Sequence, residues 1–208
     1  MLLYKYKSLA QFDHVADILV NERLYCARYY DLNDPFEGLL VHAKRCEPWG
    51  LFPEGKMITN KSVDDIVGYE DYIAFRVCSL SSNCNDVRLW SHYGDGHRGV
   101  AIEIDVPACV NKFEKVSYRD SLYYFEDPRY ADPSPIEVLT CKTSHWAYEA
   151  EYRIIQTDEF FPIPGYIRRV IMGINCRRRS EKILETLLPA GVSLCRADLN
   201  HEKVIIET

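Results

Sequence analysis

The segment Trp-Ala-Tyr-Glu-Ala-Glu-Tyr-Arg at 146–153 carries the most informative group of charged side chains. We predict a strand over 148–156, which places Glu149, Glu151 and Arg153 on one face, about 6.6–6.8 Å apart in succession. Such a face can be solvated, with its charges paired to one another. Alternatively, it lines a polar cleft in which one carboxylate stabilises a sugar-derived oxocarbenium ion, as carboxylates beside a glycosidic bond do. Crowding of the two glutamates then raises the pKa of one toward that of a general acid.

A second segment, Arg-Leu-Trp-Ser-His-Tyr-Gly-Asp-Gly-His-Arg-Gly at 88–99, places three glycines beside four rings. Glycine lets the backbone approach closely, so Trp90, His92 and Tyr93 can contact a flat ligand. The alternative is a core Trp and Tyr followed by turn glycines. Zinc ligation by His92 and His97 with Cys84 lacks metal-like spacing, and no Cys-x-x-Cys pair occurs, so we predict no metal site.

Three further groups have both a structural and a functional interpretation. Asn-Asp-Pro-Phe-Glu at 33–37 is typical of a turn closed by an Asp or Asn side chain, although Asp34 and Glu37 can instead line the same cleft. Lys142 and His145 precede the Glu-x-Glu strand and face either solvent or that cleft. The basic run at 177–179 is a solvated turn or a phosphate contact. No dinucleotide, Walker-type, zinc-protease or Gly-x-Ser-x-Gly motif occurs in the sequence.

The elements that must position these residues are short. Apolar residues, which alternate at 2–6, 72–79 and 100–106, predict strands in those segments and at 23–29, 116–119, 148–156, 167–172, 192–195 and 203–206. Helical spacing and caps predict helices from Ser8, after Ser62, at 86–93, 108–115 and 136–141, and from Ser180. Residues 44–60 are predicted to form a surface excursion and 121–135 a candidate lid loop. Irregularly placed short helices among short strands indicate an α+β fold in one domain over 1–208.

Composition narrows the functional classes. A net charge of −6 and a pI near 5.5 argue against a protein that coats nucleic acid through bulk positive charge, although a local basic groove stays open. No apolar run approaches the roughly 18 residues of a membrane span, and the first residues lack a secretory pattern. We therefore expect a cytoplasmic protein without a membrane partner, whose eight cysteines are mostly small core residues.

Taken together, the motifs resemble those of a known family. These are Tyr-Lys-Tyr near the start, Leu-Asn-Asp-Pro-Phe-Glu, Leu-Trp-Ser-His-Tyr-Gly-x-Gly-His-x-Gly-Val-Ala-Ile-Glu, and Lys-x-x-x-Trp-x-Tyr-Glu-x-Glu-Tyr-Arg. They resemble, in order, the bacterial family called domain of unknown function 2971, from about residue 3 to the closing strands. The family name carries no activity.

The order of strand, helix, strand, aromatic-glycine segment and late Glu-x-Glu strand is more distantly similar to ADP-ribosyltransferases. That resemblance implies a mixed, mostly antiparallel split sheet with short helices, and NAD as substrate. It implies that Glu151 stabilises the oxocarbenium ion as nicotinamide leaves, and that Glu149 orients the acceptor. Tyr93 or Trp90 takes the aromatic role beside NAD. The first-strand position falls on Tyr4 or Tyr6, where this chain departs from the His or Arg of that superfamily.

We also count His92 and Arg153 among the residues expected to contact NAD. The resulting hypothesis is transfer of ADP-ribose to a protein, a nucleic acid, a small molecule or water, in a bacterial toxin or anti-phage effector that an antitoxin or defence partner accompanies. The alternative is a non-catalytic nucleotide-binding or sensing module with the same cleft.

Overall fold

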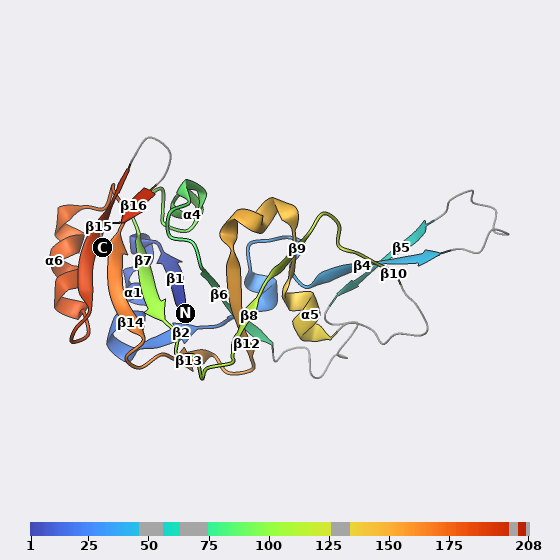
Figure 1. Cartoon of the computed structure of the whole chain (residues 1–208), viewed down its shortest axis with the longest axis horizontal. Coiled ribbons are helices and arrows are strands. Elements are labelled where there is room, and N and C mark those ends of the chain that lie inside the picture. Colours follow the sequence, from blue (N-terminus) through green and yellow to red (C-terminus); the bar gives the residue numbers. More distant parts are fainter. Residues whose placement is uncertain (46–55, 63–74, 126–133, 200–203, 207–208) are drawn as a thin grey trace.

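The computed structural model describes residues 1–45, 56–62, 75–125, 134–199 and 204–206. Within them the chain has an α+β fold with a large, mostly antiparallel mixed sheet and short helices (Figure 1). The helices are α1 (Phe12–Asn21), α4 (Val87–His92), α5 (Pro135–Leu139) and α6 (Arg178–Leu187). Short 3-10 turns are η1 (Leu9–Gln11), η2 (Tyr29–Asp31) and η3 (Ser144–Glu149).

In the large sheet, β1 (Leu2–Lys7) lies near the middle. From edge to edge its described strands are β16 (Val204–Ile206), β15 (Ser193–Leu199), β14 (Ile167–Met172), β7 (Val100–Asp105), β1 (Leu2–Lys7), β6 (Arg76–Ser81), β12 (Glu151–Gln156) and β8 (Phe113–Lys115), with β3 (Ala27–Arg28) also paired to β6. The β14–β15 pair is parallel, and the other described neighbours in this sheet are antiparallel.

Smaller sheets flank the large one. They comprise β10 (Tyr123–Phe125), β4 (Leu39–Arg45) and β5 (Lys56–Ser62); β11 (Cys141–Thr143) with β9 (Ser117–Arg119); and β13 (Phe160–Pro162) with β2 (Arg23–Tyr25). The β4–β5–β10 sheet extends away from the main body (Figure 1).

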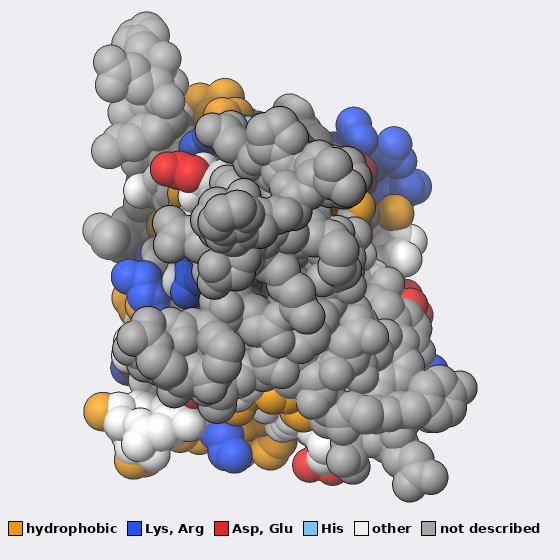
Figure 2. Space-filling view, turned by 90° about the vertical axis from the view of Figure 1, so that its right-hand side faces the viewer, with side chains coloured by type: hydrophobic (Ala, Val, Ile, Leu, Met, Phe, Trp, Pro, Cys, Tyr) orange, Lys and Arg blue, Asp and Glu red, His pale blue; other side chains and the backbone are white. Residues whose placement is uncertain are grey.

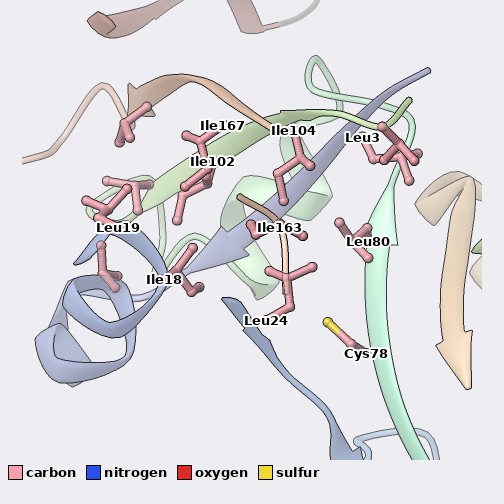
Figure 3. Packing of buried hydrophobic residues seen from close by; sticks show 14 of the residues in the cluster. Leu3, Ile18, Leu19, Leu24, Cys78, Leu80, Ile102, Ile104, Ile163 and Ile167 are labelled. Carbon is pink, nitrogen blue, oxygen red and sulfur yellow. The ribbon is translucent and has the colours of Figure 1, made fainter. Parts of the chain in front are cut away.

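Both faces of β1 are covered, because alternate side chains enter different cores. Leu3 packs with Val15, Ile18 and Leu19 of α1, whereas Tyr4 and Tyr6 pack with Leu89 and Trp90 of α4. Figure 3 shows the first core, where side chains of α1, β1, β6 and β7 meet: Leu3, Ile18, Leu19, Leu80, Ile102 and Ile104. The central strand therefore lies between two helical layers.

The sheet opens between β1 and β6. β1 pairs with β7 along its whole length, from Leu2 opposite Asp105 to Lys7 opposite Val100. With β6, which the structure also describes throughout, β1 shares only the position at which Tyr4 lies opposite Ser81. Beyond that position the two strands diverge, so a wedge forms between residues 5–7 and 77–80.

Several predicted elements differ from the observed ones. The strand predicted at 148–156 begins at Glu151, because 144–149 form η3 and Ala150 turns the chain with a left-handed φ of 44°. The predicted helix at 108–115 is wrong: Phe113–Lys115 form β8, where pairing with β12 replaces local helical bonds. The last helix begins at Arg178 rather than Ser180.

The predicted surface excursion at 44–60 is in part regular. Residues of β4 and β5 form an antiparallel pair, from Leu39 opposite Ser62 to Arg45 opposite Lys56. Residues 46–55 lie outside the described part of the chain, as do the helix predicted after Ser62 and residues 126–133 of the loop predicted at 121–135. The strands predicted at 100–106 and 167–172 are confirmed as β7 and β14.

Replacing Leu19 by Ala tests the packing of α1. Leu19 is 1% exposed in the core, so Leu19→Ala is expected to reduce the free energy of unfolding by about 2–5 kcal/mol through lost burial and a cavity. Its neighbour Val20 is 61% exposed, and Val20→Ala should change stability by less than about 0.5 kcal/mol. Urea unfolding of both variants measures the difference, and equal effects would contradict this packing.

Candidate functional site

A cavity of about 200 Å³ occupies the wedge between β1 and β6. Residues 4–7 of β1 form one wall, and residues 77 and 79–81 of β6 form another. Charged side chains that line it come from three further segments: Glu37, Lys142, Glu149, Glu151 and Arg153. The divergence of two central strands thus leaves room for polar groups inside an otherwise apolar fold.

Glu149 and Glu151 converge on one buried ammonium group. Nζ of Lys142 lies 2.8 Å from Oε2 of Glu149 and 2.9 Å from Oε2 of Glu151. All three residues are at most 4% exposed. The glutamates do not share a strand face, since Glu149 ends η3 and Glu151 begins β12. The left-handed turn at Ala150 brings them together instead.

Arg153 is fully buried and binds members of this cluster through its guanidinium group. Its Nε donates to Oε1 of Glu151 at 2.7 Å, and its terminal nitrogens bind both carboxylate oxygens of Glu37. It also donates to the carbonyl of Leu139 at the end of α5. Fork-like, charge-assisted pairing of this kind offsets the cost of burying a guanidinium.

The turn at 33–37 serves both of its proposed roles. Oδ1 of Asp34 accepts from the backbone N–H of Phe36 at 2.9 Å, which is the predicted turn, and Asp34 does not line the cavity. Glu37, three residues later, reaches Arg153 with a buried carboxylate. The carboxylate of Glu37 therefore lies at the cavity, whereas the carboxylate of Asp34 stabilises the turn itself.

The cluster holds three carboxylates against two cations, so its charges do not balance when all are ionised. Burial raises the pKa of Glu151, but the charges of Arg153 and Lys142 outweigh burial and lower this pKa to about 2. Burial raises the pKa of Glu149 above its usual value, against the opposing effects of Lys142 and Tyr93. Glu151 is thus an anion at neutral pH, and Glu149 is the carboxylate suited to exchange a proton.

Three tyrosines also line the cavity. Tyr93 donates to Oε1 of Glu149 and accepts from the side-chain amide of Asn33 at 2.9 Å. Tyr6 donates to the carbonyl of Asn83 at 2.9 Å, and Tyr4 is 7% exposed. Tyr4, Tyr6 and Tyr93, each predicted to contact a ligand, do line the cavity, together with Glu149, Glu151 and Arg153.

Trp90 and His92 do not line the cavity. Trp90 is fully buried: its Nε1 donates to the carbonyl of Cys84 at 2.9 Å, and its ring meets Tyr6 edge-to-face at 5.2 Å. This placement matches the alternative of a core Trp. His92 is exposed, with Nδ1 3.1 Å from the hydroxyl of Tyr148. Neither ring faces the cavity.

Two cavity lysines were missed by the motif analysis. Lys5 and Lys7 alternate with Tyr4 and Tyr6 along β1, and both line the cavity. The signal that could have found them is a pair of charged residues within a central strand, where full burial of both faces disfavours charge unless it has a use. Nζ of Lys5 donates to the carbonyl of Ser79 at 2.8 Å.

Other observations bound the kind of site. Among the described residues, no group of three or more His, Cys, Asp or Glu side chains is arranged to hold a metal ion. No described helix has both the length and the apolar content that crossing a membrane requires. In Figure 2 basic and acidic side chains are both visible around the edge of the view.

Comparison with known proteins identifies one similar family. Residues 89–154, about a third of the chain, match the model described as "Protein of unknown function (DUF2971)". This match supports the resemblance to that family and covers the segment from α4 to β12. No curated protein and no solved structure matches the chain.

Removing the ammonium between the glutamates should destabilise the fold. Lys142→Met leaves Glu149 and Glu151 buried without it, so we expect a loss of about 3–5 kcal/mol in the free energy of unfolding. Adding Glu149→Gln should recover part of this loss. Urea unfolding at neutral pH measures both, with Lys182→Met on the exposed side of α6 as the control. A loss below about 1 kcal/mol would contradict the pairing.

Acid should weaken the protein through Glu151. Because its folded pKa of about 2 lies below the ordinary glutamate value of 4.5, Glu151 contributes stability that is present above pH 4.5 and lost as pH falls toward 2. We expect this contribution to be about 3 kcal/mol. Unfolding measured across that window should show a smaller pH dependence for Glu151→Gln than for the unmodified protein. Identical slopes would mean that Glu151 is not stabilised as an anion.

Proposed function

We propose that the protein is an ADP-ribosyltransferase-like enzyme that cleaves the nicotinamide–ribose bond of NAD. The observation that carries the proposal is the pair Glu149 and Glu151, held by Lys142 in a cavity that Tyr4 and Tyr93 also line. A carboxylate that is ionised at neutral pH beside one that can be protonated is the combination that glycosidic cleavage uses. An open wedge in a mostly antiparallel sheet is compatible with the split sheet that the resemblance implies.

In this mechanism the bond between C1 of the ribose and the ring nitrogen breaks, and its electron pair stays with nicotinamide. The positive charge that develops on the ribose is stabilised by the anion of Glu151, whose direction Arg153 fixes. The acceptor then attacks C1 and loses a proton, which Glu149 accepts because its pKa is raised. The hydroxyl of Tyr93 holds Glu149 in place through its hydrogen bond.

The acceptor is proposed to be a protein or a small molecule, with water or a nucleic acid as further possibilities for the test. The net charge of −6 disfavours a polyanionic acceptor. A role as a bacterial toxin or anti-phage effector, with an antitoxin or defence partner, follows by analogy with the activity alone.

A second candidate is a non-catalytic nucleotide-binding module. Every oxygen of the two glutamates already has a partner: Tyr93 and Lys142 for Glu149, and Arg153 and Lys142 for Glu151. A network so fully paired favours recognition by shape and charge. A structural pair between Arg153 and Glu149 would favour this candidate further, but Arg153 binds Glu151 and Glu37 instead.

Nicotinamide release from NAD tests the proposal. Glu151→Gln removes the anion beside the developing charge and is expected to lower the rate by on the order of 10²–10³. Glu181→Gln, which removes an ion-paired carboxylate on α6 outside the cavity, should leave the rate unchanged. Circular dichroism confirms that each variant is folded.

The other outcomes are equally informative. NAD binding without nicotinamide release would support the second candidate. If calorimetry detects no NAD binding and no nicotinamide is released, both candidates are rejected. Release that survives Glu151→Gln would place the chemistry on another residue.

A further inference from the structure

Cys26 and Cys78 are two buried thiols that the proposed mechanism does not use. Both are free, are at most 1% exposed, and belong to the core that packs against α1. In Figure 3 the side chain of Cys78 extends from β6 toward Leu24 in that core. Buried thiols commonly serve only as small apolar side chains, so their mutual geometry decides whether they can react.

The strand register places the two thiols against each other. β3 and β6 are antiparallel, with Ala27 opposite Val77. Extending this register by one residue puts Cys26, which directly precedes β3, opposite Cys78. Opposite residues of an antiparallel pair have Cα atoms about 4.5–5.5 Å apart, within the ~4.4–6.8 Å that a disulfide spans. Because both side chains enter the same core, the sulfur atoms lie on one face and hydrogen-bond to each other.

The surroundings give the two thiols different reactivity. Nζ of Lys5 donates to the carbonyl of Ser79, the residue after Cys78, at 2.8 Å. The hydrogen bond with Cys26 lowers the pKa of Cys78, against the effect of burial, and the charges of two lysines on β1, Lys5 and Lys7, lower it further. The same hydrogen bond and burial raise the pKa of Cys26. Since the thiolate is the nucleophilic form of cysteine, Cys78 is suited to attack a reagent and Cys26 to attack the product.

The cavity gives a small reagent access to this pair. Neither thiol lines the cavity, but the residues on both sides of each thiol do: Tyr25 and Ala27, and Val77 and Ser79. Lys5 lines the cavity and also hydrogen-bonds to Cys78, so its side chain connects the two. A volume of about 200 Å³ admits several molecules the size of water, each about 30 Å³ in the liquid. It is below the ~300–1,000 Å³ of pockets that enclose drug-sized ligands, so a bulky oxidant is excluded.

We propose that Cys26 and Cys78 form a peroxide-reactive pair that closes reversibly into a disulfide. The thiolate of Cys78 attacks one oxygen of hydrogen peroxide and becomes a sulfenic acid, while the O–O bond breaks and hydroxide leaves with its electron pair. The sulfur of Cys26 then attacks the sulfur of Cys78, and the proton of Cys26 leaves with the sulfenic hydroxyl as water. The hydroxide takes up the proton that Cys78 lost. Two thiols thus lose two electrons and two protons, and peroxide is reduced to two waters.

This reaction is independent of the proposed function, because it needs neither NAD nor the glutamates of the cavity. The new bond would join the segment that precedes β3 to β6, which forms one wall of the cavity. A dithiol reductant would restore both thiols by thiol–disulfide exchange.

Thiol mapping of the folded, full-length protein tests the proposal. The protein is treated with hydrogen peroxide at neutral pH, its remaining thiols are blocked with N-ethylmaleimide, and its peptides are mapped by mass spectrometry. We expect a linked Cys26–Cys78 peptide that dithiothreitol removes, and far slower linkage with glutathione disulfide. Cys176→Ala, in the same core, should leave the reaction unchanged.

Two variants test the roles of the separate groups. Lys5→Met should slow the linkage several-fold by reducing the thiolate fraction of Cys78, whereas Lys182→Met on α6 should not. In Cys26→Ser, dimedone should trap a sulfenic acid on Cys78. Circular dichroism confirms that each variant is folded, and mapping of the unmodified protein needs no variant.

Several results would overturn the proposal. Cys109 is exposed, so its oxidation shows that peroxide has acted in each sample. No linked peptide while Cys109 is oxidised, or linkage only after unfolding in urea, would reject the reactive pair. Equal rates with peroxide and glutathione disulfide would reject peroxide as the class of oxidant. An unchanged rate in Lys5→Met, or no trapped acid in Cys26→Ser, would reject Cys78 as the activated thiol.

Discussion

A fully buried guanidinium is the constraint on which this part of the fold depends. Arg153 cannot leave its donors unsatisfied in an apolar interior, so the chain must bring acceptors to it from several segments. They are Glu151 on its own strand, Glu37 after the turn at 33–37, and the carbonyl of Leu139 at the end of α5. One side chain thereby joins three parts of the chain that lie far apart in sequence. If any of these partners were lost, the guanidinium of Arg153 would be left with an unsatisfied donor in an apolar interior.

The same network gives two neighbouring glutamates different chemistry. Glu151 faces two cations and stays ionised, whereas Glu149 shares one cation and receives a hydroxyl hydrogen bond. Burial acts on both, yet the pKa shifts have opposite directions because the neighbouring charges differ. A buried ion cluster contributes little net stability by itself, so its retention is better explained by the specific arrangement that it imposes on the cavity.

Sequence patterns predicted the strands best where branched apolar residues recur over a short segment, as in β7 and β14, since such residues favour a buried, pleated strand. They failed where a single backbone conformation decides the outcome. Alanine seldom adopts the left-handed φ that Ala150 has, so the sequence does not predict this turn. The two glutamates were expected to lie close together on one strand face, whereas the turn brings them together. Periodicity likewise cannot tell a ring that contacts ligand from one that fills a core, which is why Trp90 and Tyr93 could not be separated.

The single pairing position between β1 and β6 has a mechanical consequence. The large sheet consists of two strand groups, one from β16 to β1 and one from β6 to β8, which meet at Tyr4 and Ser81. A small rotation about that junction would alter the width of the cavity while every ladder within each group stays intact. Side-chain contacts across the wedge oppose such a rotation: the hydrogen bond from Lys5 to the carbonyl of Ser79, and the packing of Leu3 and Leu80 in one core.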